Sequence, residues 1–542
     1  MSQVPCSECR PATFGHFLCD RCREVARRER SLGLAGARVL VSTFAGIFGE
    51  KSGGRGSDPR PPNTPDATER NAAATTEHEH VAAPTKVSDR CDSRGDSRRR
   101  GRRFSAASDR YVSLATDGQV LVGLDGRRVE VGGGDSCVVM AAAARQLAGG
   151  DGAELIVFIH PAAHDGWGLP AHAGLEEPPA FFAGATRVGP AAWAVPGAPK
   201  VYFLLPAHSG DFAGAADVSQ LLAAVEAFRQ AVGMAYLFSG ASTLHKLIKA
   251  RSRPTIPPPE PDLTPPYTPT AYAVPAHAWH RPLADGGGWV RAFDRSGSYL
   301  AAWRGVTLSD GPWEQSTDVV VIPGPESGRP PGYWLVSEAT RAAVTAAAAS
   351  LGLPDPLTRW AGPDAPPGPL WATTPLLQLV VDILGEAIPV DEAWITPGHC
   401  RALDVPGEVL GAARTTLAAG TPADRIALDV VKVGYAAAVA WLEYGPGPGD
   451  ALHRPHWRRT LLDRHVANTY RGLQKATTAP FALTGVDCAL FAVDGPDTVP
   501  EGLRIGTGLG AWKPKGQPVP AAAAADALAD RGVAAVMQLV GA

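Results

Sequence analysis

The chain has 542 residues, which gives room for two or three hydrophobic cores. Its hydrophobic content of 45% and charged content of 19% are those of an ordinary globular protein. Its formal net charge of −3 excludes a global electrostatic signal for nucleic-acid binding, so any such binding must depend on local basic patches. No apolar run reaches the length of a membrane span and no signal sequence opens the chain, so we expect a cytoplasmic protein whose eight cysteines are thiols or metal ligands rather than disulfides.

Residues 1–28 contain two C-x-x-C pairs separated by nine residues, formed by Cys6, Cys9, Cys19 and Cys22. Four thiolates at this spacing can close a tetrahedron around Zn²⁺, and a structural zinc site uses all four positions. The alternative, two unrelated redox pairs, lacks the strand–helix context that such motifs need. The spacing therefore predicts a small structural zinc bead and does not identify what the bead binds.

Residues 51–108 hold hardly any large apolar side chain, so this segment cannot offset its own ordering entropy and is predicted to be a disordered linker. Within it, residues 90–103 carry seven arginines against two aspartates. Such a run is compatible both with a non-specific contact to nucleic-acid phosphates and with a solvated linker.

Residues 109–250 have an α/β pattern, with strand-like runs at 119–124, 155–160 and 201–205 and an amphipathic helix at 218–232. Acidic residues are sparse here: Asp117 precedes a glycine in a turn-like context, and Asp125 belongs to a hairpin turn signal. No D-x-E pair lies on a strand, and no carboxylate or cysteine is spaced to complete a metal site with His160 or His164. We therefore expect a non-catalytic domain. The proline-rich residues 251–275 follow as an extended linker between two folded units.

Residues 276–542 begin with a predicted buried strand at 289–293 that ends on Asp294. A strand tip is rigid, so an acid there is suited to holding a metal ion. The alternative is that Asp294 caps the following helix, which is the commoner role for such an aspartate. The stretch by itself leaves both interpretations open.

Further along, the pattern predicts strands at 318–322 and 333–336 and helices at 376–384, 427–442 and 457–475. The second helix places Lys432 just off its apolar face, and the third is basic. Residues 481–493 read as a hairpin with Gly485 and Asp487 at or beside its turn, and a glycine-rich turn precedes two lysines, Lys513 and Lys515. The alanine-rich tail is compatible with a last helix.

Two carboxylates at the tips of buried strands, with a lysine on a nearby helix, are a recurring arrangement for phosphoryl transfer. Paired aspartates suit Mg²⁺, which binds few carboxylates and keeps coordination places for substrate phosphates. A lysine can hold the incoming triphosphate as a mobile point charge.

Here the sequence resembles a family. Residues 288–516 look like the palm and fingers of family B DNA polymerases of the protein-primed kind, and still more like the telomere-associated protein (Tap) family of linear bacterial replicons. Asp294-Arg-Ser-Gly-Ser-Tyr299 matches the polymerase motif D-x-x-S-L-Y-P at its Asp and Tyr, and Leu483-Thr-Gly-Val-Asp487-Cys488 aligns with Y-x-D-T-D-S at its second, metal-binding Asp. Lys432 aligns with the Lys of K-x-x-x-N-S-x-Y-G, whose Asn, Tyr and Gly are replaced by Ala436, Val439 and Ala440.

The resemblance implies a set of roles for individual residues. Asp294 and Asp487 would be the catalytic ligands of Mg²⁺, Tyr299 and Lys432 would contact the nucleotide, and Lys513, Arg458 and Arg459 would contact DNA. It also implies an α/β (α+β) fold class: a degenerate RNase H-like, exonuclease-type domain at 109–250, then a polymerase-like palm and fingers at 276–542. Fewer than thirty residues follow Lys515, too few for a full thumb.

Two functions follow as expectations. The first is a Tap-like, nucleoid-associated replication protein that binds the ends of linear DNA, partners a terminal protein, and adds the first nucleotides onto it by metal-dependent nucleotidyl transfer. The second is a catalytically inert, polymerase-shaped DNA-binding scaffold. It is favoured by the loss of the Asn, Tyr and Gly of the motif that contains Lys432 and by the missing thumb. In a third interpretation both aspartates are turn residues of an unrelated α/β protein.

Overall fold

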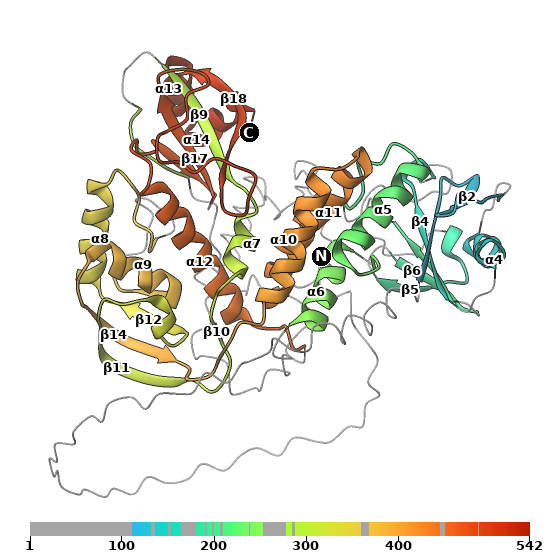
Figure 1. Ribbon diagram of the computed structural model, residues 1–542, viewed down its shortest axis with the longest axis horizontal. Helices are drawn as coiled ribbons and strands as arrows, with labels where there is room; N and C mark the ends of the chain where they lie inside the picture. The colour runs from blue at the N-terminus through green and yellow to red at the C-terminus, as the bar shows by residue number, and fades with distance from the viewer. Residues whose placement is uncertain are drawn as a thin grey trace, which may run out of the picture.

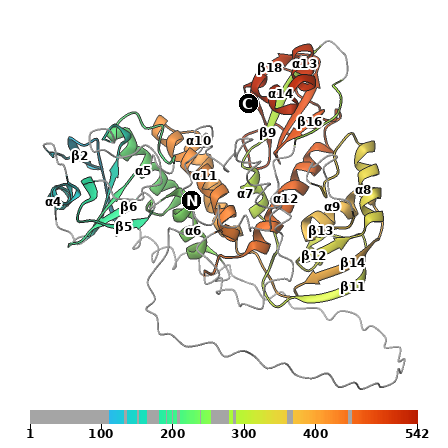
Figure 2. The ribbon, with the colours of Figure 1, turned by 180° about the vertical axis from the view of Figure 1, so that it is seen from behind.

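The computed structural model describes residues 111–131, 136–149, 153–163, 180–189, 192–197, 200–205, 210–237, 239–252, 278–283, 288–358, 368–444, 450–485 and 487–541. The four cysteines of the predicted zinc bead, the arginine-rich segment and His164 lie outside these residues, as does nearly all of the proline-rich stretch. The described residues form one α/β unit near the N-terminus (residues 111–252, the N-terminal unit), followed by a five-stranded, a four-stranded and a two-stranded sheet with their helices (Figures 1 and 2).

The N-terminal unit is built on a seven-stranded sheet with the order β3-β2-β1-β4-β7-β6-β5. Strands β1, β4 and β7 run parallel, whereas β2, β3, β5 and β6 pair antiparallel. Its strands are β1 (Tyr111–Thr116), β2 (Val120–Gly123), β3 (Arg128–Glu130), β4 (Glu154–Ile159), β5 (Thr186–Gly189), β6 (Ala192–Val195) and β7 (Val201–Leu204). Its helices are α4 (Cys137–Ala148), α5 (Val218–Val232) and α6 (Gly240–Arg251), with the short 3₁₀ helices η1 (Pro161–Ala163) and η2 (Ala180–Phe182).

Helices cover both faces of this sheet because its strand residues are apolar on both sides. Alternate residues of β4 point to opposite faces, so Val157 packs toward α4 and Phe158 toward α5. Helix α5 begins where Asp217 accepts a hydrogen bond from the backbone N–H of Gln220, and it ends at Gly233, whose φ is 69°. The predicted strands and the helix at 218–232 are confirmed. Asp117 and Asp125 accept backbone N–H hydrogen bonds within their own turns, so both are turn residues as predicted.

A second pair of helices, α10 (Asp404–Ala418) and α11 (Pro422–Tyr444), packs against α5 and α6 of the N-terminal unit. Figure 1 shows the four helices side by side, and their apolar residues belong to one continuous core. The approach is close: a Cβ on Gly434 would lie 2.7 Å from Leu244 Cδ1 and 3.2 Å from the Gly240 carbonyl oxygen. The proline-rich stretch therefore separates the two units along the chain but not in space.

A five-stranded sheet with the order β18-β9-β17-β16-β8 carries the predicted strand tip and hairpin. One face packs against the C-terminal helices through residues such as Ala292 and Leu490, and the other packs through Phe293 and Phe491 into the core that contains α12. The elements are β8 (Ala278–His280), β9 (Trp289–Arg295), β16 (Ala482–Thr484), β17 (Cys488–Val493), β18 (Trp512–Pro520), α12 (Pro455–Leu473), α13 (Ala521–Arg531) and α14 (Val533–Val540). The helix expected in the alanine-rich tail is therefore present.

Between β9 and α10 the chain forms a separate four-stranded sheet with the order β11-β14-β12-β13. Figure 1 shows this sheet with two helices at the far side of α12 from the N-terminal unit. The elements are α7 (Ser298–Trp303), β10 (Leu308–Ser309), β11 (Glu314–Val321), η6 (Glu326–Gly328), β12 (Gly332–Val336), α8 (Glu338–Ser350), β13 (Leu370–Thr373), α9 (Thr374–Leu384), β14 (Ile388–Ile395) and β15 (His399–Cys400). Among the described residues, no helix combines the length and apolar character needed to cross a lipid bilayer.

Candidate active site at the tips of β9 and β17

Antiparallel pairing of β9 with β17 brings the two predicted aspartates together. Cys488, the first residue of β17, lies opposite Asp294, and the backbone N–H of Arg295 donates a 3.0 Å hydrogen bond to the carbonyl oxygen of Asp487. The two carboxylates therefore lie at the same end of adjacent strands. Their side chains are 21% and 27% exposed, so both carboxylates are partly accessible at the strand ends without being freely solvated. We refer to them and the side chains around them as the aspartate site.

Charge and burial act on the two carboxyls in the same direction. Burial raises the pKa of Asp294, and the nearby Asp487 raises it further by like-charge repulsion. Burial also raises the pKa of Asp487, although Ser298, Lys515 and Arg295 oppose this effect. A bound cation would reduce the electrostatic repulsion between two partly buried carboxylates placed in this way.

The structure excludes the helix-cap role for Asp294. Helix α7 is preceded by Gly297, with φ 55° and ψ 40°, and no side chain caps its first turn. The Asp294 carboxylate instead lies 3.4 Å from Nζ of Lys513. Asp487 likewise does more than close a turn, because its Oδ2 accepts a 2.5 Å hydrogen bond from Ser298 Oγ.

Basic side chains reach the site from β18, the edge strand on the other side of β9. Lys513 pairs in register with Asp294, and Lys515 pairs with Ala292. Lys515 is two residues after Lys513 in β18, so both lysines lie on the same face of the sheet. The Lys513 side chain is 46% exposed, so it combines contact with Asp294 and access from solvent. The contact between Lys513 and Asp294 was not predicted from the sequence, and the predicted role of Lys513 toward DNA stays a prediction.

Arg295, next to Asp294, has a structural position that the sequence did not indicate. Its guanidinium is buried and donates to the carbonyl oxygen of Gly510 at 3.0 and 3.2 Å and to Thr469 Oγ1 at 3.2 Å. It also lies over the ring of Trp512. Burial lowers its pKa to about 10. Arg295 therefore ties the strand tip to the glycine-rich turn and to α12.

Helices α7, α11 and α12 place three further side chains around the carboxylates. The ring of Tyr299 lies 4.7 Å from the ring of His465, and burial raises the pKa of the Tyr299 hydroxyl, with Asp487 acting in the same direction. Burial raises the pKa of Tyr435 to about 12, and both aspartates raise it further. Burial, with the positive charge of Arg295, lowers the pKa of His465 to about 3, so its ring is neutral.

The cation that helix α10 brings to the site is Arg414, which the sequence reasoning missed. A Cβ on Gly297 would lie 2.5 Å from Nη1 of Arg414, so the guanidinium touches the turn between Asp294 and Tyr299. Arg414 also acts on the pKa of Tyr435, lowering it. Lys432, the predicted triphosphate contact, pairs with Asp429 at 2.8 Å on its own helix and is 41% exposed.

The arginines predicted to contact DNA on α12 are engaged in ion pairs. Arg459 is 4% exposed and lies 3.6 Å from Oδ2 of Asp463, an oxygen that also accepts hydrogen bonds from the backbone N–H and Oγ1 of Thr373. Arg458 pairs with Glu443 and is also partly buried. Arg459 is therefore a core residue with no surface to offer a DNA phosphate, and that assignment is corrected. Basic composition alone did not distinguish a solvated face from one facing carboxylates.

The donor set at the aspartate site fits Mg²⁺. Among the described residues no group of three or more histidine, cysteine, aspartate or glutamate side chains is arranged to enclose a metal ion. Mg²⁺ commonly binds through one or two carboxylates and completes its shell with water and substrate phosphates. Asp294 and Asp487, which repel each other at the ends of adjacent strands, are such a pair. The described cysteines, Cys137, Cys400 and Cys488, are buried free thiols.

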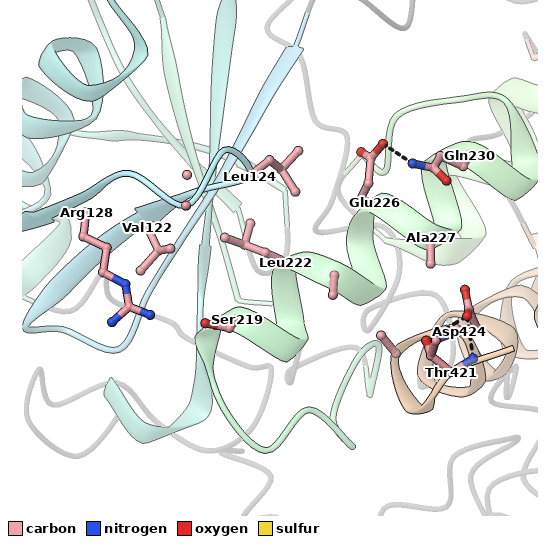
Figure 3. A pocket seen from close by; sticks show the side chains of 14 residues that line it. Val122, Leu124, Arg128, Ser219, Leu222, Glu226, Ala227, Gln230, Thr421 and Asp424 are labelled. Carbon is pink, nitrogen blue, oxygen red and sulfur yellow. Dashed lines mark hydrogen bonds between the residues drawn. The ribbon is translucent and has the colours of Figure 1, made fainter.

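A separate pocket of about 450 Å³ lies between the β2–β3 hairpin, α5 and the start of α11 (Figure 3). None of the residues that line it belongs to the aspartate site. Its acidic side chains already have partners: Glu226 accepts from Gln230 and Arg229, and Asp424 accepts from Thr421. The pocket therefore adds no chemistry to the site.

No protein-family model matches the chain, and no curated protein matches its sequence. Several solved structures do match. Phi29 DNA polymerase complexed with primer-template DNA and incoming nucleotide is 11% identical over 74% of this chain and 83% of that chain, with a TM-score of 0.41. Phi29 DNA polymerase complexed with single-stranded DNA is 10% identical over 74% and 82%, with a TM-score of 0.39. The chain is thus similar to these polymerases in the course of its backbone, and the roles of individual residues depend on the geometry described above.

Proposed function

We propose that this chain is a DNA-binding replication protein that transfers nucleotidyl groups in a metal-dependent reaction of the family B, protein-primed type. The observation that carries the proposal is the convergence of Asp294 and Asp487 at adjacent strand tips, with Lys513 beside them. Neither aspartate is needed there as a cap, and together they destabilise each other electrostatically, which is typical of residues kept for chemistry.

In this proposal Asp294 and Asp487 hold Mg²⁺, which supplies, when bound, activation of the attacking hydroxyl and neutralisation of the leaving pyrophosphate. Tyr299 presents its ring to the nucleotide from α7. Arg414 and Lys432 provide positive charge for the triphosphate from α10 and α11. Lys513 contacts the primer strand, or a priming protein, from β18.

The biological setting is the ends of linear DNA with a terminal protein as primer, as in the Tap-like family that the sequence motifs resemble. The order of the motifs around Asp294, Lys432 and Asp487 along the chain supports this part. The arginine-rich residues 90–103 and a zinc bead at Cys6, Cys9, Cys19 and Cys22 would add DNA contacts and a structural Zn²⁺ outside the described residues. A nucleoid location would follow from DNA binding.

A second function, an inert polymerase-shaped DNA-binding scaffold, is favoured by two ion pairs. Lys432 is engaged with Asp429, and Asp294 already has a cationic partner in Lys513. A site neutralised by its own lysine could persist without a metal ion. In this version the chain would bind DNA with the usual salt dependence and would incorporate no nucleotide.

Nucleotide incorporation separates the two functions. The full chain is incubated with Mg²⁺ or Mn²⁺, a labelled dNTP, and either a primer–template duplex or a terminal protein with its DNA end. We expect extension or a protein–nucleotide adduct that is lost, by at least about a hundredfold, in Asp294→Asn and Asp487→Asn. The matched control is Asp530→Asn, which changes an exposed aspartate that pairs with Arg531.

Salt-dependent DNA binding without any incorporation by the wild-type chain would establish the scaffold. Incorporation that persists in both aspartate variants would show that the aspartate site is not the catalytic one.

A further inference from the structure

His465 is a buried polar residue at the aspartate site whose burial the proposed reaction does not by itself explain. Its side chain is 0% exposed, and neither Nδ1 nor Nε2 has a hydrogen-bond partner. Burying a polar nitrogen without a partner is unfavourable, so native structures rarely keep such a group without a reason. A phenylalanine would fill the same volume without that cost.

The imidazole ring is directed at one atom of the aspartate site. Nε2 lies 3.7 Å from Oδ2 of Asp487, slightly beyond hydrogen-bond distance. The same oxygen accepts the 2.5 Å hydrogen bond from Ser298 Oγ. Two potential donors from different helices therefore converge on Oδ2, whereas no described residue donates a hydrogen bond to Oδ1.

Helix α12 fixes the ring in this position. Two residues before His465, Asp463 binds the backbone N–H and Oγ1 of Thr373 at 3.0 and 2.8 Å, and Trp457 Nε1 donates to the carbonyl oxygen of Ser309 at 2.7 Å. The ring also packs against Tyr299. A side chain on so rigid a support can orient its neighbour accurately.

We propose that His465 and Ser298 are positioning residues for Asp487, which jointly hold Oδ2 and leave Oδ1 to face the cation. A neutral imidazole carries one ring hydrogen, and the acceptor at Nε2 selects the Nε2–H tautomer. A displacement of the carboxylate by less than 1 Å, to about 2.9 Å, completes the second hydrogen bond. The inference depends on the proposed function in assigning the cation to Asp487.

This arrangement is the usual way in which a protein orients a carboxylate ligand of a metal: the ligand oxygen faces the ion and its other oxygen is held by donors behind it. Ser298 occupies a place where the polymerase motif has Leu, so the donor is a feature of this chain. The His465 ring is 0% exposed and its Nε2 faces Oδ2 of Asp487, so we assign it a role behind the carboxylate rather than as a ligand.

The first test is the tautomer of His465 in the wild-type chain without metal. Histidine-labelled protein is studied by ¹⁵N NMR, and the His465 signals are assigned by their loss in His465→Phe. We expect the Nε2–H tautomer, with signals that move in Asp487→Asn. The Nδ1–H tautomer would overturn the inference whether or not the protein incorporates nucleotides.

The second test is Mn²⁺ affinity, measured by electron paramagnetic resonance of the free ion. We expect His465→Phe and Ser298→Ala each to weaken binding about 10- to 100-fold, and the double variant to be less than additive because both donors serve one oxygen. His465→Gln, which keeps an N–H near Nε2, should recover part of the affinity. The matched control is His456→Phe, which replaces another buried histidine of α12, one that packs against Trp313 and Trp457.

Thermal unfolding without metal distinguishes positioning from packing. We expect His465→Phe to be at least as stable as the wild type while binding Mn²⁺ more weakly. A destabilised His465→Phe variant with unchanged Mn²⁺ affinity would overturn the inference. Mn²⁺ affinity equal to that of the wild type in His465→Phe, Ser298→Ala and the double variant would also overturn it. Mn²⁺ binding that depends on His465 in a chain that incorporates no nucleotide would support the inference and reject the proposed function.

Discussion

Replacing Gly297 with alanine tests how the turn between Asp294 and Tyr299 connects the fold to nucleotide binding. With φ at 55°, this position costs an L-residue roughly 1–2 kcal/mol in backbone strain. An added Cβ would also lie 2.5 Å from Arg414 Nη1 and 2.6 Å from Leu509 Cδ2. Both atoms are at the ends of flexible side chains, so we expect them to move by about 1 Å to reach ordinary contact rather than to unfold the site.

Gly305 provides the matched control, because it has φ 72° and a Cβ there would meet nothing within 4 Å. Both alanine variants should lose about 1–2 kcal/mol in guanidinium unfolding followed by tryptophan fluorescence. Only Gly297→Ala should also bind a labelled dNTP more weakly, by roughly 10- to 100-fold, since a shift of about 1 Å in a positioning cation has effects of this size. Equal nucleotide affinity in the two variants would refute the idea that Arg414 serves the nucleotide.

Three further predictions concern stability. Burial raises the pKa of both Asp294 and Asp487, so the folded chain without divalent cation loses stability as the pH rises from their ordinary pKa of 3.8 through the raised pKa values. Asp487→Asn should therefore be more stable than the wild type at pH 7, and this difference in stability should shrink toward pH 4. Denaturation curves at the two pH values check this, and a wild type that gains stability over the same range would contradict it. Arg459→Ala should cost about 3–5 kcal/mol because it leaves Asp463 buried without its cation, whereas Arg471→Ala, which removes an exposed pair with Asp382, should cost at most about 1 kcal/mol. Gly434→Ala should lower the free energy of unfolding by about 1–2 kcal/mol, because the clash with Leu244 outweighs the gain in helix propensity, and a stabilised variant would show that the α6–α11 approach is looser than described.

The sequence predicted the site where local pattern carries the information. Strand periodicity located the tip at Asp294 and the hairpin at Asp487, and the amphipathic run located α11. It did not predict Ser298, His465, Tyr435 or Arg414 as neighbours of these carboxylates. Each comes from a different helix, and helix or strand periodicity gives the face of an element but not the element that it meets.

Arg459 and the N-terminal unit illustrate two further limits. The basic composition of α12 suggested a DNA-binding face, but the pairing of Arg459 with Asp463 depends on burial, which composition does not report. The proline-rich stretch correctly indicated a break in the chain pattern. It gave no sign that α5 and α6 would share a core with α10 and α11, because linker composition describes the connection and not the surfaces on either side.

That shared core constrains how substrates reach the aspartate site. Helices α10 and α11 share a hydrophobic core with α5 and α6 of the N-terminal unit, and α11 crosses α6 closely at Gly434 and Gly240, so we expect the helix pair to move together with that unit. A movement of the α10 backbone that carries Arg414 away from the turn at Gly297 would therefore also move the seven-stranded N-terminal unit. Access to the aspartate site by such a movement would be slow, because the whole N-terminal unit would move with α10 and α11. Mutations at the α6–α11 crossing would then change the rate of access, although this crossing is remote from the carboxylates.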